Sequence, residues 1–192
     1  MNKFIRCVVA LTAGVLLTAP LAATAQDNTE VGAQETTTVA PMRIANGTRF
    51  GQWTVNCEAL AVNETACVLT QRLIRTSDNA YLAEILAFWS GDGSKSYLAA
   101  RVPTGVYFPA GFALKPQDSD KRYDFVWQSC GRDICEALLE LSADQIAELE
   151  EVESVIAGYR PNLVSQPVVF KLGIIGAGAG LEALKSSQQA GK

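Results

Sequence analysis

Two pairs of cysteines constrain the fold of this chain more than any other feature of its sequence. Cys57 and Cys67 lie between two apolar, strand-like runs, and Cys130 and Cys135 enclose a short turn farther along the chain. Each pair flanks a hairpin-like turn, which favours local pairing among the three pairings that four cysteines allow. Disulfides over such short loops would each stabilise the fold by about 2–3 kcal/mol. The sequence therefore predicts a disulfide-stapled domain.

Other roles for these four cysteines fit their spacing less well. A structural zinc site of four cysteines normally uses Cys-x-x-Cys pairs, whereas nine and four residues separate the cysteines here. Thioredoxin-like chemistry also requires Cys-x-x-Cys, at the start of a helix, and the sequence has no such motif. A catalytic thiol needs a base, and the chain contains no histidine. We therefore assign all four cysteines to disulfides and expect no metal, no cofactor and no catalytic residue.

The first 25 residues are organised like a secretory signal peptide. Lys3 and Arg6 form a basic start, residues 7–17 are apolar, and residues 23–25 match the small-x-small pattern of a cleavage site. The apolar run is shorter than the ~20 residues that span a bilayer. We expect cleavage after Ala25 and no transmembrane segment in the mature chain. Export would place the protein in the periplasm, where disulfides persist. The cell surface and secretion are the alternatives.

Composition excludes several classes of function. Removal of Lys3 and Arg6 leaves 14 basic against 20 acidic side chains, so the formal net charge changes from −4 to −6. An acidic chain without a basic cluster is unsuited to nucleic acid, and we expect no nucleic-acid partner. The absence of histidine excludes Ser-His-Asp and Cys-His catalysis, and it excludes histidine-ligated zinc.

The remaining chain is expected to form one domain. Residues 26–48 are polar and poor in aromatic side chains, which predicts a flexible leader. The expected domain covers residues 49–186, and residues 187–192 form a frayed tail. Short apolar runs at regular spacing, separated by glycine and proline, predict a mainly β fold, an antiparallel β-sandwich of immunoglobulin-like or jelly-roll-like type. The expected strands cover residues 53–57, 68–74, 82–90, 95–102, 122–130, 135–141 and 167–174.

One or two short helices are expected beside these strands. Ser142 can cap the first helix, because Gln145 follows at the spacing of a capping box. The second helix is expected around residues 180–186, after a glycine-rich segment that superficially matches a dinucleotide-binding loop. A true GxGxxG motif counted from Gly176 would need glycine where Leu181 stands, and too little chain follows for a βαβ unit. We interpret these small residues as the means by which a helix packs close to the sheet.

Several blocks of this sequence resemble one protein family. The blocks are RFGQWTVNCE, ACVLTQ, VPTGVYFPAGFALK, CGRDICEA and LGIIGAGAGLEAL. From Phe50 to Leu184 they resemble, in order, the invasion-associated locus B family, whose members are exported proteins chiefly of alphaproteobacteria. Gln52, Gly173 and Ala177 depart from the residues usual at their positions. The resemblance implies a compact β-sandwich with cysteines placed like these four, and it implies no catalytic residues.

These observations together lead us to expect a binding function. The expected protein is an exported, non-enzymatic binding protein of the cell envelope, whose partner is a protein or another envelope component. The family takes its name from members that help bacteria enter host cells, which implies host-cell interaction as one role. Two alternatives stay open: a small-ligand carrier with an apolar internal pocket, and an envelope enzyme with two facing carboxyl groups. The partner and the oligomeric state also stay open at this point.

Overall fold

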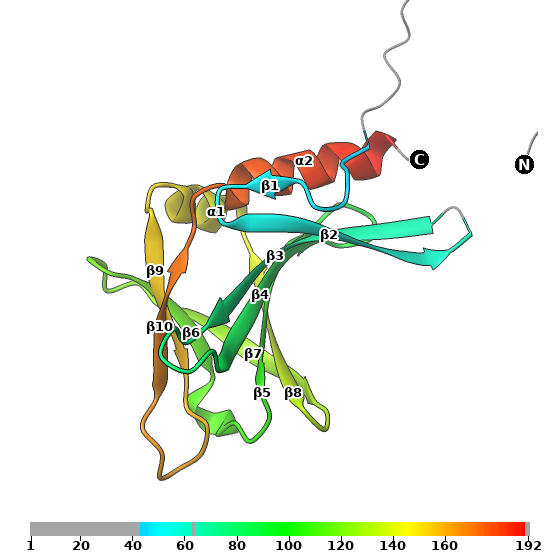
Figure 1. Ribbon diagram of the computed structural model, residues 1–192. Helices are drawn as coiled ribbons and strands as arrows, with labels where there is room; N and C mark the ends of the chain where they lie inside the picture. The colour runs from blue at the N-terminus through cyan, green and yellow to red at the C-terminus, as the bar shows by residue number, and fades with distance from the viewer. Residues whose placement is uncertain (1–42, 63, 191–192) are drawn as a thin grey trace, which may run out of the picture. The chain divides into compact units, whose positions relative to one another are not determined.

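A computed structural model of the chain describes residues 43–62 and 64–190, arranged as Figure 1 shows. Its main element is one antiparallel sheet with the strand order β1-β2-β3-β4-β5-β8-β7-β6-β9-β10. The strands are β1 (Arg49–Phe50), β2 (Trp53–Ala61), β3 (Glu64–Ile74), β4 (Tyr81–Trp89), β5 (Ser96–Pro103), β6 (Phe112–Pro116), β7 (Tyr123–Cys130), β8 (Ile134–Leu141), β9 (Ser154–Tyr159) and β10 (Val168–Gly173). The helices are α1 (Ala143–Glu150), α2 (Ala177–Ala190) and the 3-10 turn η1 (Phe108–Ala110).

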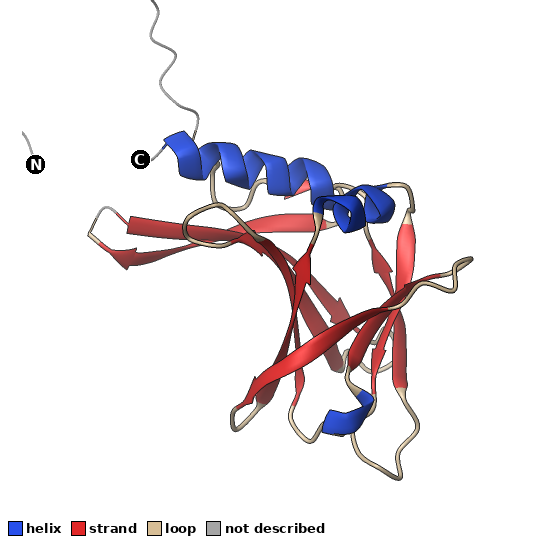
Figure 2. Cartoon of the chain, turned by 180° about the vertical axis from the view of Figure 1, so that it is seen from behind, coloured by secondary structure: helices blue, strands red, loops and turns tan. Residues whose placement is uncertain are grey.

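The sheet curls so that its two halves enclose one core. Strand β7 pairs with β8 on one side and with β6 on the other, and it thereby joins the two halves. The expected mainly β, antiparallel fold with two helices is confirmed. The two halves that face each other belong to one continuous sheet, joined through β7, and do not form two separate sheets. Figure 2 shows α1 and α2 side by side along one end of this sheet, with η1 at the opposite end. Neither α-helix in the described residues has the length and apolar content of a membrane span.

Alternation of apolar and polar residues explains how the strands face the core. In β2, Trp53 and Val55 are fully buried, whereas Asn56 is exposed, as a period of two residues requires. The indole Nε1 of Trp53 donates a hydrogen bond to the carbonyl oxygen of Gly173, at 3.2 Å, which links β2 to the end of β10. Trp53 is thus a core residue, and it connects the two halves of the sheet.

Glycines bring α2 close to the sheet. Gly176 has φ +93°, and a Cβ there would lie 2.3 Å from the carbonyl oxygen of Phe50. Gly51, in the turn before β2, is equally close to the carbonyl oxygen of Ile175. At Gly180 a Cβ would lie 2.5 Å from Leu69 Cδ1. Only residues without a side chain permit such approaches, and the predicted role of the glycine-rich segment in close helix packing is confirmed.

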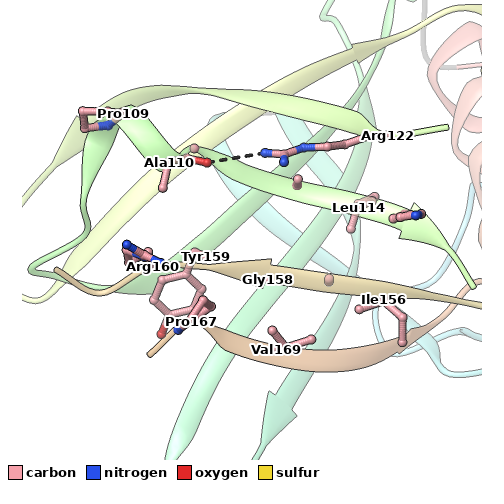
Figure 3. Close-up of a pocket in the computed structure, with 14 residues that line it drawn as sticks. Pro109, Ala110, Leu114, Arg122, Ile156, Gly158, Tyr159, Arg160, Pro167 and Val169 are labelled. Atoms are coloured by element: carbon pink, nitrogen blue, oxygen red, sulfur yellow. Dashed lines mark hydrogen bonds between the residues drawn. The ribbon is translucent and has the colours of Figure 1, made fainter. Parts of the chain in front are cut away.

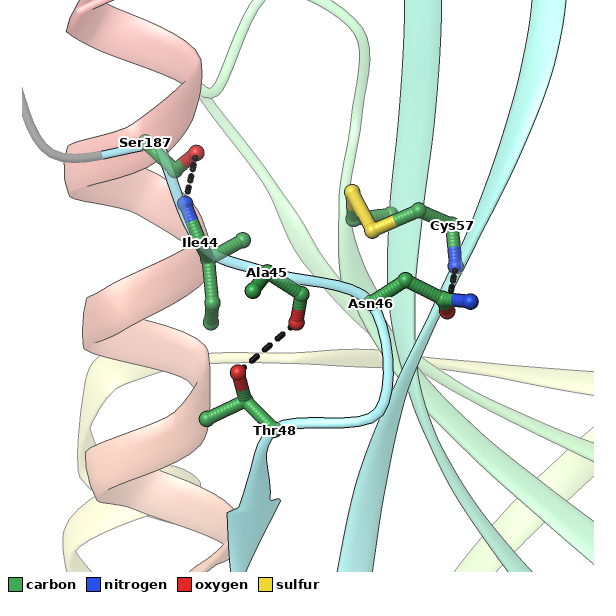
Figure 4. Close-up of a disulfide and its surroundings, with 7 residues drawn as sticks. Ile44, Ala45, Asn46, Thr48, Cys57 and Ser187 are labelled. Atoms are coloured by element: carbon green, nitrogen blue, oxygen red, sulfur yellow. Dashed lines mark hydrogen bonds between the residues drawn. A yellow bond between two sulfur atoms is a disulfide. The ribbon is translucent and has the colours of Figure 1, made fainter. Parts of the chain in front are cut away.

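The folded part begins before Arg49 and ends after residue 186. The backbone N–H of Ile44 donates to Ser187 Oγ at 3.1 Å, and the side chain of Asn46 accepts from the backbone N–H of Cys57 at 2.9 Å (Figure 4). The first bond fastens the segment before β1 to α2, and the second satisfies part of the edge of β2 that the short strand β1 leaves uncovered. The flexible leader and the frayed tail are therefore shorter than expected, because residues 43–48 and 187–190 belong to the fold. The expected signal peptide and the remainder of the leader lie outside the described residues.

Candidate binding groove

A groove with a volume of about 540 Å³ lies on the outer face of β6, β9 and β10. Figure 3 shows its lining, which comes from these three strands and from the segments that flank them. The groove is open to solvent, and its lining mixes apolar side chains with cationic ones. The lining includes Ala113, Lys115, Arg122, Ile156, Gly158, Arg160 and Val169.

The hollow follows from small residues in one row across the sheet. Gly158 of β9 lies opposite Ala113 of β6 on one side and opposite Val169 of β10 on the other. Residues at this spacing point to the same face of a sheet, so the row has almost no side-chain volume at its centre. The next row on that face contains Ile156 opposite Lys115. The larger side chains of that row form one wall of the groove.

The groove is basic, although the protein as a whole is acidic. Lys115, Arg122 and Arg160 line it, and its lining contains no acidic residue. Arg122 Nε donates to Asp124 Oδ1 at 2.6 Å. Lys115 Nζ lies 3.8 Å from Oδ1 of the exposed Asp120. Among the described residues, Arg160 has no carboxylate within ion-pair distance. Its unneutralised charge makes the groove attractive to an anionic group.

The groove lies at an unpaired edge of the sheet. Strand β10 is the last strand in the sheet order, and among the residues that the structure describes it pairs only with β9. Its outward-facing Val169 is 60% exposed. An edge strand with apolar and cationic surface beside it is suited to contact with another chain. The arrangement supports binding, and it contains none of the paired groups that acid–base catalysis requires.

The structure joins the four cysteines as Cys57–Cys67 and Cys130–Cys135, the pairing that the sequence favours. Cys57 lies directly opposite Cys67 in the β2–β3 hairpin. Cys130 lies opposite Cys135 where the β7–β8 hairpin turns. None of the four lines the groove. Each disulfide thus stabilises one hairpin, and neither forms part of the groove.

Non-reducing peptide mapping should recover the two disulfides as separate cross-linked peptides. We expect one peptide pair to join Cys57 to Cys67 and another to join Cys130 to Cys135, because each pair is directly opposed across neighbouring strands. Removal of the Cys57–Cys67 bond by double substitution with serine should lower the free energy of unfolding by about 2–3 kcal/mol. Peptides that join one hairpin to the other, or alkylated free thiols in the native protein, would contradict this pairing.

A second cavity is too small for a ligand. It lies between α1, α2 and the core face of the sheet, and its lining includes Trp53, Ile146 and Leu181. Its volume is about 20 Å³, whereas ligand pockets in proteins measure ~300–1,000 Å³. The cavity is a packing gap between helices and sheet. It offers no support for a carrier of small apolar ligands.

The pKa values of two carboxyl groups, those of Asp92 and Glu148, are lowered, which does not suit a general acid. A side-chain hydrogen bond from Ser90 lowers the pKa of Asp92, and one from Lys121 lowers the pKa of Glu148. A general acid at neutral pH needs a raised pKa. Within the described ranges no cluster of acidic, cysteine or histidine side chains could hold a metal ion. The groove combines a hollow, an uncompensated cationic side chain and an edge strand, and we take it as the candidate binding site.

Comparison with known proteins gives concordant results at three levels. The profile of the family described as invasion associated locus B (IalB) protein matches residues 53–185. Invasion protein B homologs of Brucella abortus strains 2308 and biovar 1 strain 9-941 are each 27% identical over 139 residues, which cover 71% of this chain and 78% of the relative. The crystal structure of invasion associated protein B from Bartonella henselae is similar with a TM-score of 0.61 and 14% identity, over 74% of this chain and 96% of that one. At such an identity this last likeness concerns the fold alone.

Proposed function

This chain belongs to the invasion associated locus B family, and we propose that it is an exported, non-enzymatic binding protein of the cell envelope. The proposed binding surface is the groove on β6, β9 and β10. One observation carries the proposal: a row of small residues between cationic side chains forms an open groove beside the edge strand β10. The signal-peptide pattern of residues 1–25 supports export.

The groove defines the chemistry of the partner. The uncompensated charge of Arg160 and the additional charge of Lys115 favour a carboxylate or another anionic group. Ile156 and the exposed Val169 add apolar surface for the remainder of the partner. We therefore expect an acidic segment of a protein with apolar residues among its carboxylates. In a family whose relatives are named invasion proteins, a surface protein of a host cell is one context for such a partner.

Charge reversal in the groove tests this function. The purified protein, immobilised and exposed to detergent-solubilised envelope proteins, should retain a partner that salt elutes, because screening weakens exposed charge pairs. The double substitution Arg160→Glu and Lys115→Glu should reduce capture of that same partner at least tenfold, equivalent to about 1.4 kcal/mol.

Arg132 provides the matched control, because it is exposed in the β7–β8 turn and does not line the groove. Arg132→Glu changes the net charge in the same direction as each groove substitution and should leave capture unchanged. Equal loss in Arg132→Glu would mean that overall charge governs binding. Full capture by the double variant would place the binding surface elsewhere.

A further inference from the structure

The β2–β3 hairpin extends beyond its disulfide as an exposed arm. We define the arm as residues 58–62 and 64–66, all of which are exposed. Leu60 is 61% exposed and Val62 is 92% exposed, so large apolar side chains lie in solvent near its end. Glu58 and Glu64 give the arm two carboxylates, and it contains no basic residue. Exposed apolar surface flanked by charges of one sign is typical of an interaction surface.

The arm is held in shape without support from the core. Cys57 and Cys67 are bonded across its base, and the ladder continues through Glu58 opposite Ala66 and Ala59 opposite Thr65. A hairpin whose base is covalently closed loses less conformational entropy when it binds. The arm is therefore pre-organised for contact with a partner.

The chemistry of the arm matches that of the groove. The arm offers two carboxylates and exposed aliphatic side chains, and the groove offers Lys115, Arg122 and Arg160 around Ile156 and Val169. In Figure 1 the arm extends away from β9 and β10, so it is directed away from the groove of its own chain. We propose that the arm of one copy docks in the groove of a second copy. This inference rests on the proposed function, because it uses the same groove as the receptor.

The contact would be head-to-tail and weak. Different surfaces of the two copies meet, so each docked pair keeps one unused arm and one unused groove, and further copies can add. An arm of this size buries much less than the ~800 Å² per partner of a standard stable interface. Association should therefore depend on protein concentration, and it should weaken as salt screens the charge pairs.

Sedimentation velocity over a concentration series tests the proposal. The purified protein should show a sedimentation coefficient that rises with concentration and falls with added salt. The arm variant Glu58→Lys/Glu64→Lys and the groove variant Arg160→Glu/Lys115→Glu should each associate at least tenfold more weakly. An equimolar mixture of the two variants should regain association, because the reversed arm can then dock in the reversed groove and the unmodified arm can dock in the unmodified groove.

Glu182→Lys is the control, since Glu182 is exposed on α2 and belongs to neither surface; it should associate like the unmodified protein. Thermal melting of every variant verifies folding. A wild-type protein that stays monomeric at all concentrations, or a mixture that fails to regain association, would overturn the proposal. Capture of envelope protein by the groove variant is then measured separately. Loss of capture would retain the proposed binding function without self-association. Full capture would reject both the binding function of the groove and the docking of the arm in it.

Discussion

Replacement of Trp53 by alanine is expected to lower the free energy of unfolding by about 3–5 kcal/mol. Trp53 is fully buried and is the largest completely buried side chain of the core. Its loss would leave a cavity and would also remove the hydrogen bond from Nε1 to the carbonyl oxygen of Gly173, which joins β2 to the end of β10. Chemical denaturation monitored by circular dichroism measures the effect.

Trp53→Phe separates the two contributions. Phenylalanine keeps most of the buried apolar volume and removes the hydrogen bond, so we expect a loss of about 1–2 kcal/mol from the unsatisfied carbonyl and the smaller ring. Val169→Ala, at a position that is 60% exposed, serves as the surface control and should change stability little. A melting temperature of Trp53→Ala equal to that of the unmodified protein would show that the core does not depend on this side chain.

Gly176→Ala is expected to destabilise the protein by about 2–5 kcal/mol. Gly176 has a positive φ of +93°, which costs a residue with a side chain energy at any site, and a Cβ would lie 2.3 Å from the carbonyl oxygen of Phe50. Because the neighbour is backbone, relief requires the β1–β2 turn to move away from the start of α2. The free energy of unfolding from a denaturant titration measures this cost.

Gly105→Ala is the matched control for Gly176→Ala. Gly105 has nearly the same φ, +94°, but an added Cβ there would meet no atom within 4 Å. We expect only the conformational cost, about 1–2 kcal/mol. The difference between the two variants then reports the close approach of the two backbone segments. Equal effects would mean that this approach contributes nothing to stability.

Local patterns in the sequence predicted much of the fold. The alternation after Trp53 predicted β2, and the spacing of Ser142 and Gln145 predicted the start of α1, whose capping box is present in the structure. The mainly β class follows from many such short runs. The disulfide pairing was favoured for the same reason, since cysteines directly opposed in a hairpin are also close in sequence.

Long-range pairing could not be predicted in the same way. Strand β9 was not among the expected strands, although Val155, Ala157 and Tyr159 alternate as buried residues. The sheet places β9 between β6 and β10, and that order depends on how the whole chain curls. The groove exists because Gly158 lies beside Ala113. Neither residue carries a chemical group that a search for sites in the sequence would select.

The most direct test of the proposed binding function is photo-cross-linking in living cells of the producing organism. A photoreactive amino acid replaces Val169 in the groove, and a second variant carries it at Ile74, which is 50% exposed at the end of β3 and does not line the groove. Mass spectrometry then identifies the adducts. We expect a reproducible protein adduct from position 169 that is absent from position 74 and is lost when Arg160→Glu is added. Identical adducts from both positions, or none from position 169, would contradict a binding function of the groove.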